Sequence, residues 1–142
     1  MTRINCGIEP KELCDQHLLA EHREIKRIPN QIRKGKCNFD GIPETFTLGN
    51  GHVKFFYNKL GYLLDRYVLL YEECKKRGFN VTCYADAWDG IPDNLMMCYS
   101  PNDNDRRIVR ARISDRIALM NKISYTEYVT FQKKTTFSDN EH

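Results

Sequence analysis

The start of the chain carries groups that can do chemistry on a sugar. Thr2 is small, so removal of Met1 would expose its α-amine beside Arg3. An α-amine has a reference pKa of about 7.7 to 8.0, well below that of lysine, and positive neighbours favour its neutral form. Glu24 supplies a carboxylate further along the chain. An amine nucleophile, a carboxylate and arginines are the parts needed to attack a sugar carbon of a nucleic acid.

A neutral amine at this place has a defined course of reaction. It attacks the anomeric carbon of a deoxynucleotide as the base leaves, and an imine results. The imine acidifies the neighbouring sugar proton and so allows β-elimination of the 3′ phosphate. The residues alone leave open that Thr2 belongs to an ordinary loose terminus. They also leave open that Glu24 is a salt-bridge partner on a helix.

Positive charge is concentrated in two blocks, although the net charge is only +3. Residues 23–36 hold six basic residues and a single acidic one, Glu24, and residues 106–116 hold five basic residues and a single acidic one, Asp115. This pattern predicts a one-sided field that attracts a polyanion. Two solvated helix faces remain the alternative.

Composition places the chain among single-domain proteins. It has 142 residues, of which 29% are charged and 41% hydrophobic. No run approaches the ~20 apolar residues of a membrane span, and the start lacks the apolar stretch of a signal peptide, so we expect a cytoplasmic protein. The six cysteines form no CxxC pair and are expected to be free thiols. We therefore expect no metal and no cofactor.

Apolar spacing predicts an all-α fold, a single compact domain of about three main helices with long loops. The helices are expected over residues 10–28, 53–77 and 104–121, with a long connection over residues 79–102. Residues 1–134 are expected to form the domain, and the polar, acidic residues 135–142 a frayed tail.

The first of these helices has to position the chemistry. Its spacing predicts that His17, Glu24 and Arg27 lie on one side, together with Ala20 or Glu21. Pro29 is expected to kink or end the helix. Gly61 is expected to interrupt the second helix.

Four stretches together carry a resemblance to a known family. They are residues 15–27 (DQHLLAEHREIKR), 49–60 (GNGHVKFFYNKL), 73–79 (ECKKRGF) and 111–118 (ARISDRIA). In order and spacing, from Met1 to about Ala118, the chain resembles the phage-type pyrimidine-dimer DNA glycosylase/AP lyase family, also called ultraviolet-repair endonuclease V.

The resemblance implies a role for each matching residue. Thr2 would be the nucleophile through its backbone nitrogen, and Glu24 would stabilise the positive sugar and assist proton transfer. Gln16 and His17 match positions near the scissile nucleotide. The phosphate-gripping positions match Arg3, Arg23, Arg27, Arg112 and Arg116. The partner would be damaged double-stranded DNA, bound by a monomer that needs no metal or cofactor, in the host cytoplasm if a phage encodes it.

The chain also departs from the family pattern. His22 replaces an aromatic residue that is usually tyrosine, and Lys26 replaces a proline. The aromatic segment near the carboxy terminus, residues 125–134 (YTEYVTFQKK), has no tryptophan, and the single tryptophan, Trp88, lies in the predicted connection. These changes leave the lesion open, so another damaged base or an abasic site is an alternative substrate.

Two other functions compete with this enzyme. One is a DNA-binding protein of the same fold that has lost catalysis or changed its specificity. The other is a metal-dependent nuclease that uses His17, His52 and aspartates, although the chain has no recognisable ligand motif for a metal.

Overall fold

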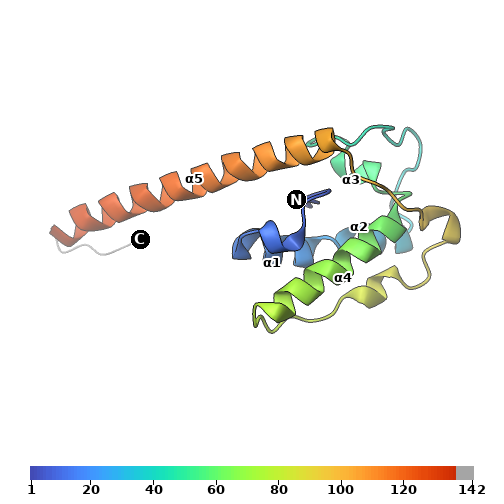
Figure 1. Ribbon diagram of the computed structural model, residues 1–142, viewed down its shortest axis with the longest axis horizontal. Coiled ribbons are helices and arrows are strands. Elements are labelled where there is room, and N and C mark those ends of the chain that lie inside the picture. The colour runs from blue at the N-terminus through green and yellow to red at the C-terminus, as the bar shows by residue number, and fades with distance from the viewer. Residues whose placement is uncertain (137–142) are drawn as a thin grey trace. The chain divides into compact units, whose positions relative to one another are not determined.

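Helices are the regular elements of the described part of the chain (Figure 1). The computed structural model describes the backbone of residues 1–136 and the side chains of residues 1–122. The α-helices are α1 (Asp15–Glu24), α2 (Arg27–Arg33), α3 (His52–Phe55), α4 (Leu60–Lys76) and α5 (Asp103–Thr136). Single 3₁₀ turns are η1 (Pro10–Glu12), η2 (Ala85–Trp88) and η3 (Asp93–Leu95). The all-α prediction is confirmed.

The chain divides into two compact units. Residues 1–106 contain every element up to the first turn of α5, and the rest of α5 belongs to the second unit. The segment in which the chain departs from the family's aromatic pattern, residues 125–134, lies outside the described side chains, as does the expected tail, residues 135–142. Over the described residues, no helix combines the length and apolar character needed to cross a membrane.

The prediction of one helix over residues 10–28 is wrong in its boundaries. The chain forms η1, then α1, and then starts a new helix, α2, at Arg27. Pro29 has no N–H to donate to the carbonyl of Ile25, so the helix cannot continue unbroken through this point. Pro29 instead occupies the first turn of α2, where an N–H would have no partner within the helix. Arg27 therefore does not share a helix face with Glu24.

The second predicted helix is also divided, but not at the glycine. The break falls over residues 56–59, between α3 and α4, and Gly61 lies in the first turn of α4. A Cβ at Gly61 would be 2.7 Å from the carbonyl oxygen of Met96 and 3.0 Å from that of Met97. The Tyr62 N–H donates to the same Met97 oxygen at 3.1 Å. Gly61 is needed because the 96–97 backbone crosses directly over it.

The core of the first unit forms where α1 packs against α4 (Figure 1). Its most completely buried side chains are Ile4, Leu18, Ile25, Phe55, Phe56, Leu60, Leu63, Tyr67, Leu70 and Cys74. Seven of these lie within the second predicted helix, residues 53–77, whereas Val68 of the same stretch is 42% exposed. Trp88 is buried, and its indole N–H donates to the carbonyl of Leu60 at 3.1 Å, so the predicted connection is fastened to the core.

A reciprocal pair of hydrogen bonds begins α5. The Asp105 N–H donates to the side chain of Asn102 at 2.8 Å, and the Asn102 N–H donates to the Asp105 carboxylate at 3.1 Å. This is the geometry of a capping box, which satisfies donors that the first helical turn leaves unpaired. The hydroxyl of Tyr99 also donates to Asp105. The predicted start of this helix at residue 104 is within one residue of the observed start, but the helix continues to Thr136, so its predicted end at residue 121 is wrong.

The crossing at Gly61 gives a stability prediction. We expect Gly61→Ala to lower the free energy of unfolding by about 1–3 kcal/mol, because the added methyl group overpacks against the Met96 carbonyl. The higher helix propensity of alanine contributes ~1 kcal/mol in the opposite direction, and we expect the cost of overpacking to exceed it. Asp65→Ala, at an exposed site on the same helix, is the control and should not destabilise. Urea unfolding measures both, and a more stable Gly61→Ala protein would contradict the packing described here.

Candidate active site at the amino terminus

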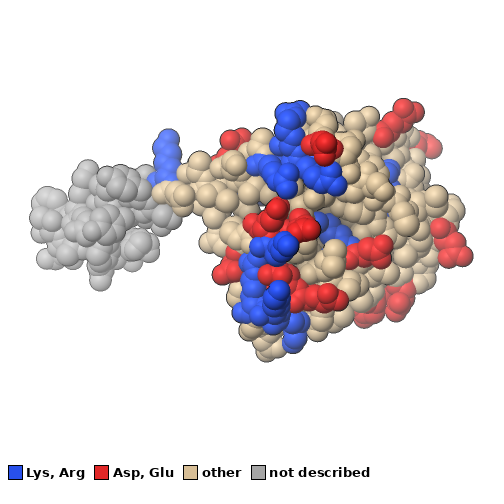
Figure 2. All heavy atoms as spheres, viewed as in Figure 1, with Lys and Arg blue, Asp and Glu red and all other residues tan. Residues whose placement is uncertain are grey.

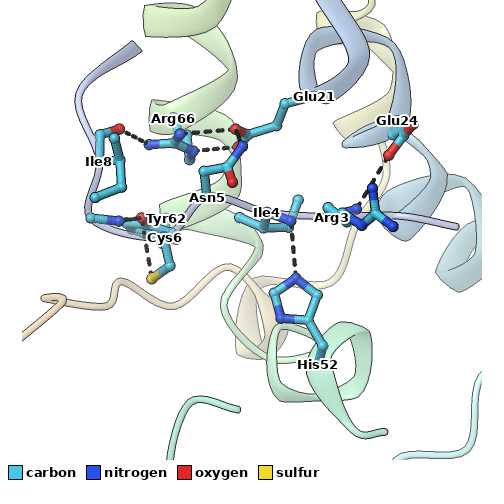
Figure 3. A network of polar contacts seen from close by, with 11 residues as sticks. Arg3, Ile4, Asn5, Cys6, Ile8, Glu21, Glu24, His52, Tyr62 and Arg66 are labelled. Carbon is cyan, nitrogen blue, oxygen red and sulfur yellow. Dashed lines mark hydrogen bonds and ion pairs between the residues drawn. The ribbon is translucent and has the colours of Figure 1, made fainter. Parts of the chain in front are cut away.

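The first residues of the chain are fastened by side chains from three helices (Figure 3). The Arg3 N–H donates to Oε1 of Glu24, on α1, at 3.3 Å. The next N–H, that of Ile4, donates to Nε2 of His52, on α3, at 2.9 Å. Figure 3 shows Glu24 and His52 on opposite sides of the segment. The backbone immediately after Thr2 is therefore held from two directions, which is not expected of a loose terminus.

A buried ion pair holds the following residues. Glu21 of α1 is 1% exposed and Arg66 of α4 is 5% exposed. Arg66 Nη2 donates to Glu21 Oε1 at 2.9 Å, and Arg66 Nε donates to Oε2. The side-chain amide of Asn5 donates to Glu21 Oε1 at 2.8 Å, and Arg66 Nη1 donates to the carbonyl of Ile8 at 2.7 Å. One ion pair thus joins α1, α4 and the amino-terminal segment.

The charges of this pair depend on each other. Burial opposes the charge on Arg66, but the facing Glu21 carboxylate outweighs burial and raises the pKa of Arg66 above its ordinary value. Loss of either partner would leave a buried charge without its counterion, at a cost of about 3–5 kcal/mol. The two charges are therefore needed together, and their hydrogen bonds fix Asn5 and the carbonyl of Ile8.

The turn at residues 6–7 is also bound to the rest of the first unit, through Tyr62 of α4. The Gly7 N–H donates to the Tyr62 hydroxyl at 3.2 Å, and that hydroxyl donates to Cys6 Sγ at 3.5 Å. Gly7 has φ of +81°, and a Cβ there would lie 2.8 Å from Arg106 Cγ. Burial raises the pKa of the Cys6 thiol to about 11, so this cysteine stays protonated near neutral pH and is a poor nucleophile.

The predicted catalytic pair meets at the outer end of this segment. Thr2 is half-buried, and its nitrogen is three bonds from that of Arg3, so the two nitrogens lie within about 4 Å of each other. The Glu24 side chain is 15% exposed and lies 3.7 Å from Nη2 of Arg23, which is 58% exposed. The structure thus brings together an amine position, a carboxylate and arginine.

The other predicted DNA contacts lie at several places on the helices. Gln16 is exposed and His17 half-buried, both on α1, and Arg27 is exposed at the start of α2. Arg112 and Arg116 are four residues apart on α5, so they lie on one side of that helix. Their contacts with DNA stay predictions.

Charges elsewhere in the first unit compensate one another. Figure 2 shows a face on which acidic and basic side chains are mixed. Ion pairs join Arg77 to Asp15 at 2.9 Å and to Glu73 at 2.8 Å, and Lys11 to Glu9 at 3.2 Å. Arg77 and Lys11, which lie outside the two basic blocks, are thus partly neutralised by neighbours, as Arg23 is by Glu24.

His22, which departs from the family pattern, is part of an aromatic cluster. Its ring lies 5.2 Å from the Tyr67 and Tyr84 ring centres and 6.2 Å from that of Tyr71. Its Nε2 is 3.0 Å from the Tyr67 hydroxyl, and the ammonium group of Lys26 sits 3.8 Å above the Tyr84 ring. His22 and Lys26, the two residues that depart from the family pattern, therefore both pack in this cluster.

A surface pocket of about 290 Å³ opens beside the cluster, lined by Leu19, His22, Arg23, Asn80, Val81, Thr82 and Tyr84.

A metal site built on the predicted histidines finds no support in this geometry. In His52 both ring nitrogens are engaged, Nε2 with Ile4 and Nδ1 with the carbonyl of Thr47 at 2.9 Å. Among the described residues, no group of three or more His, Cys, Asp or Glu side chains is placed to hold a metal ion.

Sequence inspection missed Asn5, Arg66 and the structural role of Glu21. Asn5 is 6% exposed, although it is polar and close to the terminus. A signal for Arg66 was present, because it stands in the stripe between Leu63 and Leu70 that otherwise contains apolar residues. A charged residue at such a position needs a buried partner. The partner is on another helix, so local spacing could not identify it.

The amino-terminal segment is held beside the Glu24 carboxylate by the Arg3 N–H, and the guanidinium of Arg23 lies next to the same carboxylate. The model of one family, described as pyrimidine dimer DNA glycosylase, matches residues 1–86. The chain belongs to this family, and the resemblance found in the sequence is confirmed. The match includes Thr2 and Glu24, whereas Arg112 and Arg116 lie beyond it.

The buried His22 predicts a pH dependence of stability. Burial, and then the charge of Lys26, lower the pKa of His22 below its ordinary value. The unfolded chain, in which a histidine titrates near 6.5, then binds more protons than the folded one, so stability falls as the pH drops below about 6.5. We expect His22→Phe to reduce this fall between pH 7 and pH 5, whatever its stability at pH 7. Denaturant unfolding across this range measures it, and identical slopes for the two proteins would refute the assignment.

Proposed function

We propose that the protein excises damaged bases, foremost at cyclobutane pyrimidine dimers, through an imine with the Thr2 α-amine, and then cleaves the strand by β-elimination. The observation that carries this proposal is the hydrogen bond from the Arg3 N–H to Glu24. It keeps the carboxylate beside the terminal nitrogen, where a nucleophilic amine would need it. Membership of the pyrimidine dimer DNA glycosylase family supplies the substrate class.

The proposed reaction begins at the free nitrogen of Thr2. Its lone pair forms a bond to C1′ of the nucleotide while the bond from C1′ to the base breaks and the base takes that electron pair. The nitrogen loses its protons as the sugar ring opens, which leaves an imine. Removal of a C2′ proton then expels the 3′ phosphate, and water finally hydrolyses the imine and frees the amine. One nucleophile carries both steps.

Glu24 is suited to two tasks in this sequence. Its carboxylate can stabilise the positive charge that develops on the sugar as the base leaves, and it can move a proton to or from the ring oxygen or C2′. Its side chain is mostly buried, so its charge acts with less screening than at an open surface. The bond to Arg3 aims one oxygen at the terminal backbone, which fixes the carboxylate relative to the nucleophile.

Release of the amine requires loss of Met1 without loss of the site. Met1 is 86% exposed, whereas Ile4, Asn5 and Cys6 are buried. Because the hydrogen bonds begin at Arg3, removal of Met1 breaks none of the contacts described here. Thr2 would then present its amine at the end of an already fixed segment, so little ordering cost remains for the reaction.

DNA would be held by arginines of the amino-terminal segment, of α1 and of α2. Arg3, Arg23 and Arg27 each offer a charge to a phosphate near the lesion, and Arg112 and Arg116 are proposed to grip the duplex further along. Gln16 and His17, on the same helix as Glu24, are proposed to lie near the scissile nucleotide. The pocket beside Arg23 is lined by polar as well as aliphatic and aromatic side chains, and we propose it as a place for a base flipped out of the stack.

Borohydride trapping tests the two reacting groups. We expect the Met1-free protein to form a covalent adduct with a duplex that carries a single thymine dimer. Glu24→Gln should slow adduct formation by at least about 100-fold, because a positioned acid–base group contributes 10²–10⁴-fold. Acetylation of the Thr2 amine should abolish the adduct. Glu44→Gln, which changes an exposed carboxylate outside the site, is the control and should react as the unaltered protein does.

The substrate arms of this experiment separate the possible outcomes. An adduct with an abasic duplex but not with the dimer duplex would keep the lyase step and reject the dimer as the lesion. Absence of an adduct with both duplexes would overturn the proposed chemistry and favour the non-catalytic DNA-binding protein.

A further inference from the structure

His52, the histidine of residues 49–60, has no part in the proposed chemical steps, but it binds the amino-terminal segment. His52 begins α3 and is 4% exposed, so it is closed off from a substrate in the bulk solvent. We propose that His52 is a positioning residue for the amino-terminal nucleophile, acting through the N–H of Ile4. The inference rests on the proposed function, because it concerns where the Thr2 amine is held.

The hydrogen bonds of His52 define which nitrogen carries the proton. Nε2 lies 2.9 Å from the Ile4 nitrogen, which is a donor, so Nε2 is the acceptor. Nδ1 lies 2.9 Å from the Thr47 carbonyl oxygen, which can only accept, so Nδ1 carries the proton. The imidazole is therefore neutral, with one fixed tautomer, and links the amino terminus to the 47–52 turn.

The surroundings of the ring leave it one orientation. Phe46 and Phe56 pack edge-on against it, with ring centres 5.5 and 5.6 Å away. The backbone is set by Gly51, which has φ of +88° and lies against Pro43, and by the bond from the His52 N–H to the Gly49 carbonyl at 3.1 Å. A ring held in this way is a fixed acceptor, which is what a positioning role needs.

The position of Ile4 explains why this acceptor matters for Thr2. Glu24 binds the N–H of Arg3 from one side of the segment, and His52 binds the N–H of Ile4 from the other (Figure 3). Two successive N–H groups with partners on opposite sides fix both the register and the rotation of the backbone. Without the Ile4 bond, the terminal residues could turn about the Glu24 contact, and the amine would lose its place relative to C1′.

His52 acts at a distance from the chemistry, which sets its expected kinetic signature. It contacts Ile4, Thr47, Phe46 and Phe56 rather than a reacting atom. Its loss should therefore slow the first-order step at saturating DNA. The arginines that hold the duplex are untouched, so the dissociation constant for DNA should not change.

Two amide variants of different reach separate this role from general packing. In His52→Gln the side-chain amide reaches about as far as Nε2 and can accept from Ile4, whereas in His52→Asn it reaches only the place of Nδ1. Both variants lose the ring contacts with Phe46 and Phe56, so their stabilities should be alike. We expect His52→Asn to trap the dimer duplex at least tenfold more slowly than His52→Gln, with equal dissociation constants. Equal trapping rates would overturn the proposal.

A third variant leaves His52 in place and removes the donor. Cys6 allows chemical ligation of a synthetic peptide of residues 2–5 to the chain from residue 6 onward. In that peptide the N–H of Ile4 is replaced by an ester oxygen, and the all-amide ligated protein is the control. We expect the ester protein to bind the duplex normally and to trap it at least tenfold more slowly. A rate equal to that of the control overturns the role of His52.

The control also separates this proposal from the proposed function. If the all-amide protein forms no adduct with dimer or abasic duplex, the amine chemistry itself fails, and the positioning role fails with it. If the control traps normally and the variants do too, only the role of His52 is wrong.

Discussion

The buried pair of Glu21 and Arg66 is the interaction on which the arrangement of the site depends. It connects α1 to α4 and also binds Asn5 and the carbonyl of Ile8. Removal of two charges from water offsets much of the attraction between them, so such a pair is a weak source of stability. Its value here is geometric, because a charged pair with defined donors and acceptors accepts only one position of the segment between them. Glu24 stands one helical turn after Glu21, so the same helix that holds the segment also supplies the carboxylate.

An amino terminus is an unusual place for a nucleophile, because chain ends are ordinarily loose. In this protein the N–H groups of Arg3, Ile4 and Gly7 each have a side-chain partner from a helix. The terminal residue thus extends from a segment that is supported nearly as well as the core. A nucleophile on the backbone also has no side-chain torsions of its own to order. Rigid support and few remaining degrees of freedom are what a reaction between an amine and a sugar carbon requires.

Much of the fold could be predicted from the sequence, because the apolar stripe that includes Leu63, Leu70 and Cys74 has helical spacing. The interruptions were harder to place. Pro29 ends the first helix before it rather than at it, because a proline fits the first turn of the next helix. Gly61 was taken as a breaker, whereas it permits a close crossing by residues 96–97, a contact between distant segments that local pattern cannot show. Motifs identified the family, but the polar network around Asn5 joins residues far apart in the chain, and spacing carries no trace of such pairs.

We propose above all that the fold presents the backbone nitrogen of Thr2 as the nucleophile. Peptide mapping by tandem mass spectrometry of the borohydride-reduced adduct tests it most directly. The sugar remnant is expected on the α-amine of Thr2, in a peptide that has lost Met1. A remnant on a lysine side chain, such as that of Lys26 two residues beyond Glu24, would contradict the claim and move the nucleophile to another part of the site.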